Sequence, residues 1–104
     1  MTNIIDENDP QLIRAKINGE TAKIPWKELQ RFFASGRSLY VEASLDLVEV
    51  AFSFHQDDAK QVEQWLNNEK VLAVSTDQAK RWVDEDSMVW AVVVKPWVLI
   101  QDRE

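Results

Sequence analysis

The stretch Met88–Gln101, MVWAVVVKPWVLIQ, is the most apolar run of the chain and decides how the protein folds. Its valine, isoleucine and tryptophan side chains favour an extended strand, because β-branched and aromatic residues pack well on a pleated surface. Lys95 and Pro96 interrupt the run, and proline within a sheet belongs at an edge or a bulge because it donates no backbone hydrogen bond. We therefore predict an interior final strand, packed by tryptophan-bearing helices, that reaches an edge and bends at Lys95–Pro96. A bulge there can also divide the run into two strands.

The residues that precede this run predict a helix, a strand and a second helix. Ser75 and Gln78 have the spacing of a capping box, in which each side chain bonds the other residue's backbone at the start of a helix. Residues 71–74, VLAV, predict a short buried strand, and the pair Asp57-Asp58 caps a further helix, AKQVEQWLNNEK. The apolar sides of the two helices hold Val62, Trp65 and Leu66 in the first and Ala79, Trp82 and Val83 in the second.

Residues 47–54, LVEVAFSF, allow two interpretations. Every second residue from Val48 to Phe54 is apolar, as in a strand with one buried face. The helical spacing is also satisfied, by Leu47, Val50, Ala51 and Phe54. We favour a strand that forms a hairpin with residues 39–42, LYVE, and we keep the helix as the alternative.

The first forty residues predict two helices. Asp9 supplies a capping side chain and Pro10 a favoured first residue for a helix whose stripe of isoleucines continues toward Lys23. Pro25 disfavours helical geometry at the residue before it, so it ends this helix and opens a second one, PWKELQRFFASG. Gly36 supplies the stop of that second helix.

These elements predict one small α+β domain over residues 1–104. Their order is helix, helix, strand, strand, helix, strand, helix, strand, and strands that alternate with helices favour crossover connections with parallel pairing. We expect a mixed sheet of about four strands, packed by the helices. Residues 1–8 and 102–104 are polar, and we expect both ends to be frayed.

Four segments of the chain form a recognisable series: GETAKIPWKELQRFFASG (19–36), LDLVEVAFSFHQDD (45–58), QWL (64–66) and WAVVVKPWVLIQ (90–101). Together they resemble an uncharacterised bacterial family known as domain of unknown function 2288. The resemblance covers most of residues 11–101 and implies a small stand-alone bacterial protein in the cytoplasm. It implies no activity, and no site residue carries over from it.

The composition excludes several classes of function. The chain contains no cysteine, which excludes disulfides, thiolate catalysis and cysteine-ligated metal sites and fits a reducing cytosol. The N-terminus has no basic leader followed by an apolar core. The apolar run at 88–101 is shorter than the about 20 residues that a membrane-spanning helix needs. We therefore expect a soluble, cytoplasmic protein without a membrane partner.

The net charge of −6 is unevenly distributed. Residues 11–37 carry more basic than acidic side chains, whereas residues 38–104 are strongly acidic. Nucleic-acid binding needs a concentrated basic face, so the overall acidity disfavours it. Because segment 11–37 is basic, we keep nucleic-acid binding as a third and last hypothesis, after the two given below. The same asymmetry can drive head-to-tail self-association into a homo-oligomer.

No nucleophile–base pair, metal constellation or cofactor motif stands out in the sequence. Two glycines are too few for a dinucleotide-binding or Walker-type loop, and the single histidine, His55, matches no metal-ligand spacing. We interpret His55 as a solvent-facing residue at the end of a strand. We therefore expect no metal, no cofactor and, on balance, no enzymatic activity.

Four residues are candidates for a ligand or partner surface: Glu20, Trp26, Lys95 and Trp97. Glu20 lies where the apolar stripe of the first helix continues, so its carboxylate either bonds an arginine or a helix cap or anchors a ligand. Lys95 either reaches water, pairs with an acid such as Glu49, or lines a pocket for an anionic ligand on which Trp97 stacks. Trp26 is most simply a core residue, and Trp90, which lies with the valines of the final run, is also expected to be buried. An exposed tryptophan would instead mark a partner surface.

The first functional hypothesis is a non-enzymatic binding or protein-interaction module. The alternative is a small-ligand-binding protein or an enzyme that uses Glu20 and Lys95 in a pocket near Trp97. That alternative requires the two charged groups to line one cavity.

Overall fold

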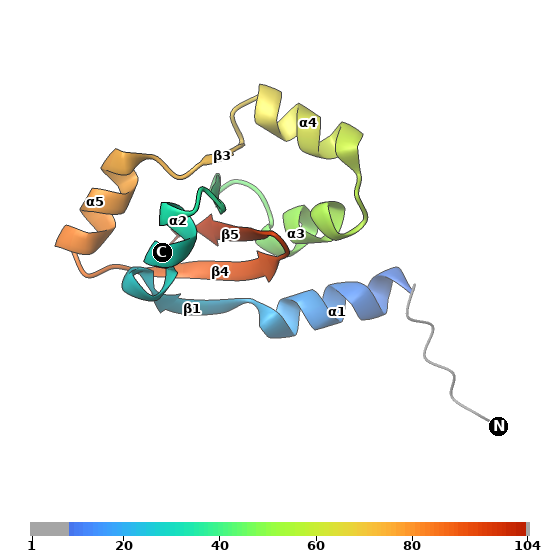
Figure 1. Cartoon of the computed structure of the whole chain (residues 1–104). Helices are drawn as coiled ribbons and strands as arrows, with labels where there is room; N and C mark the ends of the chain where they lie inside the picture. Colours follow the sequence, from blue (N-terminus) through green and yellow to red (C-terminus); the bar gives the residue numbers. More distant parts are fainter. Residues whose placement is uncertain (1–8, 104) are drawn as a thin grey trace.

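The computed structural model describes residues 9–103, and in this part of the chain five strands form one mixed sheet (Figure 1). Across the sheet the order is β1 (Ala22–Pro25), β4 (Met88–Val94), β5 (Trp97–Gln101), β2 (Ser38–Val41) and β3 (Val71–Ala73). β5 and β2 run parallel, and all other neighbours are antiparallel. The predicted α+β class and mixed sheet are confirmed, with one strand more than expected.

The apolar run forms a hairpin at the centre of the sheet. Lys95 and Pro96 make its two-residue turn, with a cis peptide bond between them, and Val94 pairs with Trp97 across it. The predicted division at Lys95–Pro96 is confirmed. β4 and β5 are interior strands, because each has a second neighbouring strand, but the pairing of β1 with β4 stops at Ala91, so the end of β4 next to the turn lies at an edge. In one continuous strand, Trp97 would share a face of the sheet with Val93. The turn instead pairs Trp97 with Val94, and paired residues of antiparallel strands share a face.

Helices cover both faces of the sheet and divide the core into two clusters. The first cluster lies between the sheet and the helices α1 (Pro10–Glu20) and α3 (Leu47–His55). The second lies between the sheet and η1 (Trp26–Leu29), α2 (Gln30–Ala34) and α5 (Thr76–Asp84). Both clusters contain side chains of β4 and β5, so the hairpin is the interior element that the apolar run predicted.

The segment 47–54 belongs to α3, so the strand that we favoured there is wrong. Asp46 caps this helix, and its carboxylate accepts hydrogen bonds from the backbone amides two and three residues later (2.9 and 3.4 Å). The residues buried at the helical spacing are Leu47, Val50 and Ala51. The alternation that suggested a strand arises because Val48 and Phe52 are partly buried against the same cluster. The predicted hairpin with residues 39–42 is therefore wrong as well.

The N-terminal region contains a strand, β1, that sequence reasoning missed. α1 ends at Glu20 and not near Lys23, because the backbone amide of Thr21 bonds a carbonyl of the last helical turn (3.2 Å). The chain then runs extended as β1 because it pairs with β4. The predicted second helix begins after Pro25, first as η1 and then as α2. Gly36 ends it with a φ of 74°, a left-handed conformation that glycine adopts without steric cost.

The predicted caps of the two later helices are confirmed. Asp58 caps α4 (Ala59–Asn67), which connects α3 to the edge strand β3. Ser75 and Gln78 form a reciprocal capping box at the start of α5. One residue assigned to the apolar side of α5 is misplaced: Val83 is 50% exposed, because it lies at the margin of the face that packs on the sheet.

Burial is less complete than predicted at β3 and at two tryptophans. Val71 of β3 is buried, but its neighbour Leu72 is largely exposed, because β3 lies at the edge of the sheet. The fully buried tryptophans are Trp26 and Trp82, as expected. The half-buried ones are Trp65, Trp90 and Trp97, of which the first two were expected to be buried.

Two contacts hold Asp102 and Arg103 against α5 and β4. Asp102 accepts a hydrogen bond from the indole nitrogen of Trp82 (3.1 Å), and the guanidinium of Arg103 lies 4.8 Å from the centre of the Trp90 ring. The expected fraying of residues 102–104 stays a prediction, and residues 1–8 and 104 lie outside the described part of the chain. Within residues 9–103, no helix has both the length and the apolar character that crossing a bilayer requires.

Candidate functional site

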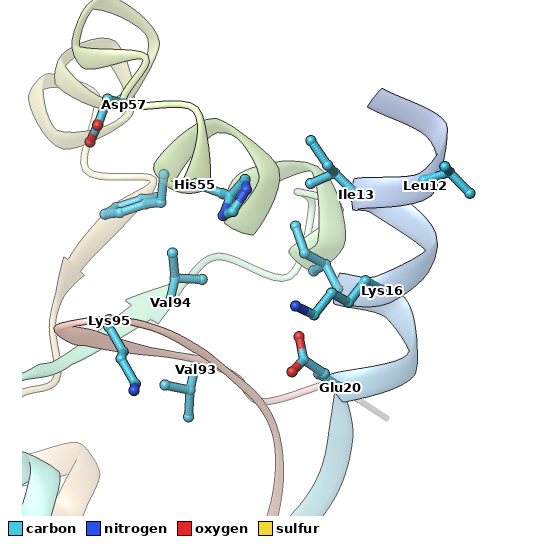
Figure 2. Close-up of a pocket in the computed structure, with 11 residues that line it drawn as sticks. Leu12, Ile13, Lys16, Glu20, His55, Asp57, Val93, Val94 and Lys95 are labelled. Atoms are coloured by element: carbon cyan, nitrogen blue, oxygen red, sulfur yellow. The ribbon is translucent and has the colours of Figure 1, made fainter. Parts of the chain in front are cut away.

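A cavity of about 970 Å³ lies between α1, the C-terminal end of α3 and the turn of the β4–β5 hairpin (Figure 2). Its apolar lining consists of Leu12, Ile13, Ile17, Phe54, Val93 and Val94. Its polar lining consists of Lys16, Glu20, His55, Asp57 and Lys95. Ligand pockets measure about 300–1,000 Å³ and combine an apolar lining with a few polar groups, so the cavity has the size and chemistry of a ligand site.

α1 supplies one wall of the cavity through its helical spacing. Ile13, Ile17 and Glu20 recur every three or four residues and therefore lie on one side of the helix. Ile17 is buried in the first core cluster and fixes which side of α1 faces the sheet. Lys16 lies beside this row, and Figure 2 shows its side chain and that of Glu20 reaching from α1 toward the β4 wall.

The hairpin turn supplies the opposite wall. Val94 packs against the first core cluster, and the chain reverses at the next two residues. Lys95 is the first residue of the turn and is exposed at the mouth of the cavity. The two-residue turn, and not a bulge in a continuous strand, thus determines where the Lys95 side chain lies.

The end of α3 closes the third side. His55 is the last residue of this helix, and the chain leaves it through Asp57, whose φ is 55°. The interpretation of His55 as a strand-end residue is therefore wrong, because its segment is helical.

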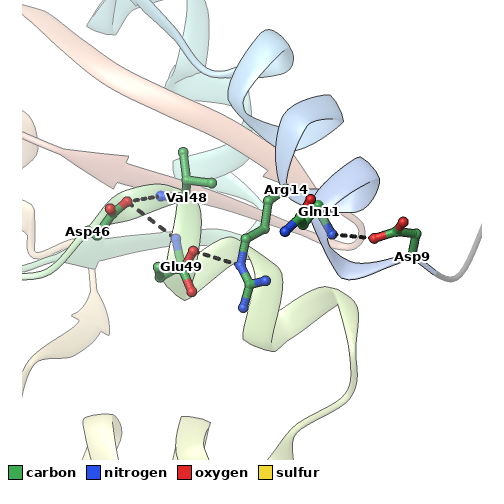
Figure 3. A network of polar contacts seen from close by, with 6 residues as sticks. All are labelled: Asp9, Gln11, Arg14, Asp46, Val48 and Glu49. Atoms are coloured by element: carbon green, nitrogen blue, oxygen red, sulfur yellow. Dashed lines mark hydrogen bonds and ion pairs between the residues drawn. The ribbon is translucent and has the colours of Figure 1, made fainter.

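The charged side chains of the cavity take no part in the ion pairs among residues 9–103. Those pairs are Arg14–Glu49 (2.9 Å), Lys70–Glu42 (2.6 Å) and Arg81–Asp102 (3.5 Å). Figure 3 shows the first pair, beside the Asp46 cap of α3. The predicted option in which Lys95 pairs with Glu49 is wrong, because Arg14 of α1 binds that carboxylate. Within the described chain, two lysines and two acids of the cavity are thus available to a ligand.

A family model described as "Protein of unknown function (DUF2288)" matches residues 12–102 of the chain. The chain belongs to this family. It is also similar to a solved structure, the NMR solution structure of PA1075 from Pseudomonas aeruginosa, at 46% sequence identity and a TM-score of 0.78. That match covers 99% of this chain and 94% of the other. The comparison with curated proteins finds no match.

In this DUF2288 chain, the cavity contains two of the four residues singled out from the sequence. Glu20 and Lys95 both line it, although they come from different ends of the fold. Trp97 is half-buried against the first core cluster and does not line the cavity. Trp26 is only 1% exposed, in the second cluster, so it cannot form a binding surface and its inclusion among the candidates was wrong.

Sequence reasoning missed the other polar residues of the cavity. Lys16 precedes Glu20 by four residues, and this spacing on one helix is a signal that two charges share a side. His55 and Asp57 carried no comparable signal, because their place in the cavity depends on how α3 packs against α1. Among residues 9–103, no three histidine, cysteine or acidic side chains lie close enough together to hold a metal ion.

A polar group away from the cavity closes the loop between β2 and α3. The side-chain amide of the buried Gln101 donates to the backbone carbonyls of Glu42 (3.0 Å) and Leu45 (2.8 Å). A hydrogen bond from Lys70, together with one from Ser44, lowers the pKa of Glu42 below its ordinary value of 4.5. These contacts tie the loop to β5 and to the start of β3, and they are structural in character.

A second polar group lies on the face of the sheet opposite α1. Burial is the main cause that raises the pKa of Tyr40 above its ordinary value of 10.0, and the nearby carboxylate of Asp102 raises it further. Arg81 acts in the opposite direction. The ring of Tyr40 lies 6.1 Å from that of Trp82, whose indole nitrogen donates to Asp102. This group fastens the C-terminal end to α5.

Proposed function

We propose that this protein is a non-enzymatic binding module and that the cavity between α1 and the β4–β5 turn is its ligand site. The observation that carries the proposal is that Glu20 and Lys95 both line one cavity with an apolar lining. Two unlike segments of the chain thus place opposite charges around the same cavity, whose apolar lining includes Ile13 and Ile17. A site of this kind binds a small molecule or segment with an apolar body and polar groups at its periphery.

Binding without catalysis is the better supported form of this function. Glu20 and Lys95 are both exposed side chains. Acid–base catalysis usually works in a site from which water is excluded, because a low dielectric strengthens each electrostatic interaction with the reacting atoms. Charged groups that stand in water at a cavity mouth instead orient a ligand and select its polar ends.

A fragment titration tests the proposal. The ¹⁵N-labelled protein is titrated with hexanoate, hexylamine and hexanamide, which share one apolar chain and differ in charge. We expect saturable shifts of the amide signals of Ile13, Ile17 and Val94 with at least one of these fragments. If none of them shifts the cavity signals, or if the shifts map to other parts of the sheet, the cavity is not a ligand site.

We also propose a bacterial cytoplasmic location, which the family resemblance and the lack of cysteine support. Self-association through the basic segment 11–37 and the acidic remainder is a separate prediction. Light scattering over a range of salt concentrations tests it, because charge-driven association weakens as salt screens the surface. A monomer at every salt concentration contradicts it, and we expect no gel shift with nucleic acid even at low salt.

A further inference from the structure

The edge of β4 that faces the cavity is open at Val93. β1 pairs with β4 only as far as Ala22 opposite Ala91, so no strand formed by residues 9–103 lies on that side of the last three residues of β4. The residues that would extend β1 along β4 belong to the C-terminal end of α1, which ends at Glu20, and residues in a helix cannot join a β-ladder. Val93 is 52% exposed and is part of the cavity wall.

Two hydrogen bonds show in which direction the backbone of Val93 points. The amide of Trp26 donates to the carbonyl of Ser87 (3.0 Å), so in the β1–β4 register every second residue from Ser87 to Val93 turns its polar groups toward the β1 side. The backbone amide of Val98 donates to the backbone carbonyl of Arg37 (2.9 Å), which lies on the β2 side. The backbone of Val98 therefore faces β2, and it does not hydrogen-bond the backbone of its pairing partner Val93. The N–H and C=O of Val93 therefore point out of the sheet into the space beside α1.

Thr21, the residue that follows α1, does not bond the backbone of Val93. Its backbone amide donates to the carbonyl of Asn18 (3.2 Å) and its hydroxyl donates to the carbonyl of Ile17 (2.8 Å), so both donors of Thr21 cap the end of the helix. An unpaired strand edge is a template for another extended chain, because its N–H and C=O groups are already spaced for a ladder. Here Val93 is the one residue at the end of β4 whose N–H and C=O are both directed to this side, so a bound chain can form one hydrogen-bonded residue pair.

We propose that the cavity binds a short extended peptide segment, one residue of which pairs with Val93 while its two neighbours place apolar side chains on Ile13 and Ile17. The inference rests on the proposed function, since it names the ligand class of the same cavity. Residues on either side of a paired residue project to the other face of a sheet. That face is the one of Val94, where the first core cluster and α1 lie.

The charges of the cavity favour a peptide over a strongly charged ligand. Its lining holds two lysines and two acidic residues, so the formal charges balance when His55 is neutral. A chain of neutral amides meets no net repulsion there, whereas a phosphate or a polyamine meets charges of its own sign. The apolar floor then selects for large aliphatic side chains next to the pairing residue.

A pair of blocked tripeptides tests the proposal. The probe is acetyl-Leu-Ala-Leu-N-methylamide, and its control is the same peptide with the alanine nitrogen methylated, which removes one donor and crowds the strand edge. Amide hydrogen exchange of the ¹⁵N-labelled protein is followed at saturating probe. We expect exchange at Val93 to slow about tenfold or more with the probe, because its N–H becomes hydrogen-bonded, and to stay unchanged with the control.

The outcomes separate this inference from the proposed function. If the six-carbon fragments shift the cavity signals but the tripeptide leaves Val93 exchange unchanged, the cavity binds ligands without strand pairing and the inference is wrong. Equal slowing by the probe and its methylated control also contradicts it, because burial would then explain the effect. If neither fragments nor tripeptides bind, the proposed function fails as well.

Discussion

Glu20, at the last turn of α1, and Lys95, in the turn between β4 and β5, line the same cavity although neither belongs to a catalytic or cofactor motif. The link between them is β1. α1 leads into this strand with one intervening residue, and the pairing of Ala22 with Ala91 places the end of α1 beside the end of β4. The cavity is therefore a consequence of strand register, and it exists because β1 stops pairing before β4 ends.

Lys95→Met separates a binding role from a structural one. Lys95 is exposed and makes no ion pair with a described residue, so the free energy of unfolding is expected to change by no more than about 0.5 kcal/mol. Binding of hexanoate is expected to weaken several-fold, and binding of hexylamine to stay equal or improve. Urea unfolding and the fragment titration measure the two effects.

Lys80→Met is the matched control, since Lys80 is also exposed but lies on α5, away from the cavity. It is expected to change neither stability nor fragment binding. A loss of hexanoate binding in this variant equal to that of Lys95→Met would show that only net charge matters, and would remove the role assigned to Lys95.

Asp46→Ala tests the helical state of residues 47–54. The Asp46 carboxylate caps α3, so its removal is expected to lower the free energy of unfolding by about 1 kcal/mol. Asp46→Asn keeps an oxygen acceptor and is expected to retain most of this stability. Both are measured by urea denaturation. Equal stability of wild type, alanine and asparagine variants would contradict the capping role.

The sequence predicted the parts of this fold that depend on neighbouring residues. Asp58, Ser75, Gln78 and Gly36 act on the helix next to them, and each was placed correctly. Residues 47–54 were misassigned because partly buried Val48 and Phe52 complete a strand-like alternation on an otherwise helical segment. Such residues satisfy both periods, and only packing against α1 and the sheet decides between them.

The missed strand and the missed site residues have a different cause. Ala22–Pro25 is extended because it pairs with Met88–Ala91. The four residues of this strand have no pattern of apolar and polar side chains that predicts the pairing. Glu20 and Lys95 were identifiable as charges within apolar patterns. Trp26 is buried, as its interpretation as a core residue predicted, and its ring packs against that of Trp82 on α5, so only the alternative of a partner surface fails.

The Glu42–Lys70 pair predicts a pH dependence with a definite sign. Its hydrogen bond with Lys70 is the main cause that lowers the pKa of Glu42 below 4.5, its ordinary value. The folded state therefore favours the carboxylate, and the contribution to stability is present above about pH 4.5 and is lost as the pH falls. Lys70→Met is expected to return the pKa of Glu42 toward 4.5, as followed by NMR titration of its side-chain carboxyl carbon.

Lys60→Met, on the exposed side of α4, serves as the control for that titration and is expected to leave the pKa of Glu42 unchanged. If Lys70→Met leaves it unchanged too, the contact between the two side chains does not persist in solution.

Tyr40 predicts a loss of stability at high pH. Burial, followed by the charge of Asp102, raises the pKa of this residue above 10.0, so the folded state keeps the phenol protonated after the unfolded chain has released its proton. The contribution to stability is present below about pH 10 and is lost as the pH rises through the folded pKa. Asp102→Asn is expected to lower the pKa of Tyr40 only in part, because burial remains.

Tyr40 is the single tyrosine of the chain, so ultraviolet absorbance of tyrosinate reports its ionisation without overlap from another tyrosine. A return of the Tyr40 pKa to 10.0 in Asp102→Asn would make the charge, and not burial, the dominant cause.

Hydrogen exchange of the free protein tests most directly whether the β4 edge is open at the cavity. The amides of Val92 and Val94 face β5 in the ladder, whereas that of Val93 faces α1. We predict fast exchange at Val93 between two protected neighbours. Protection of Val93 equal to that of Val92 and Val94 would show that the edge is already occupied, and would contradict an open β4 edge at the cavity.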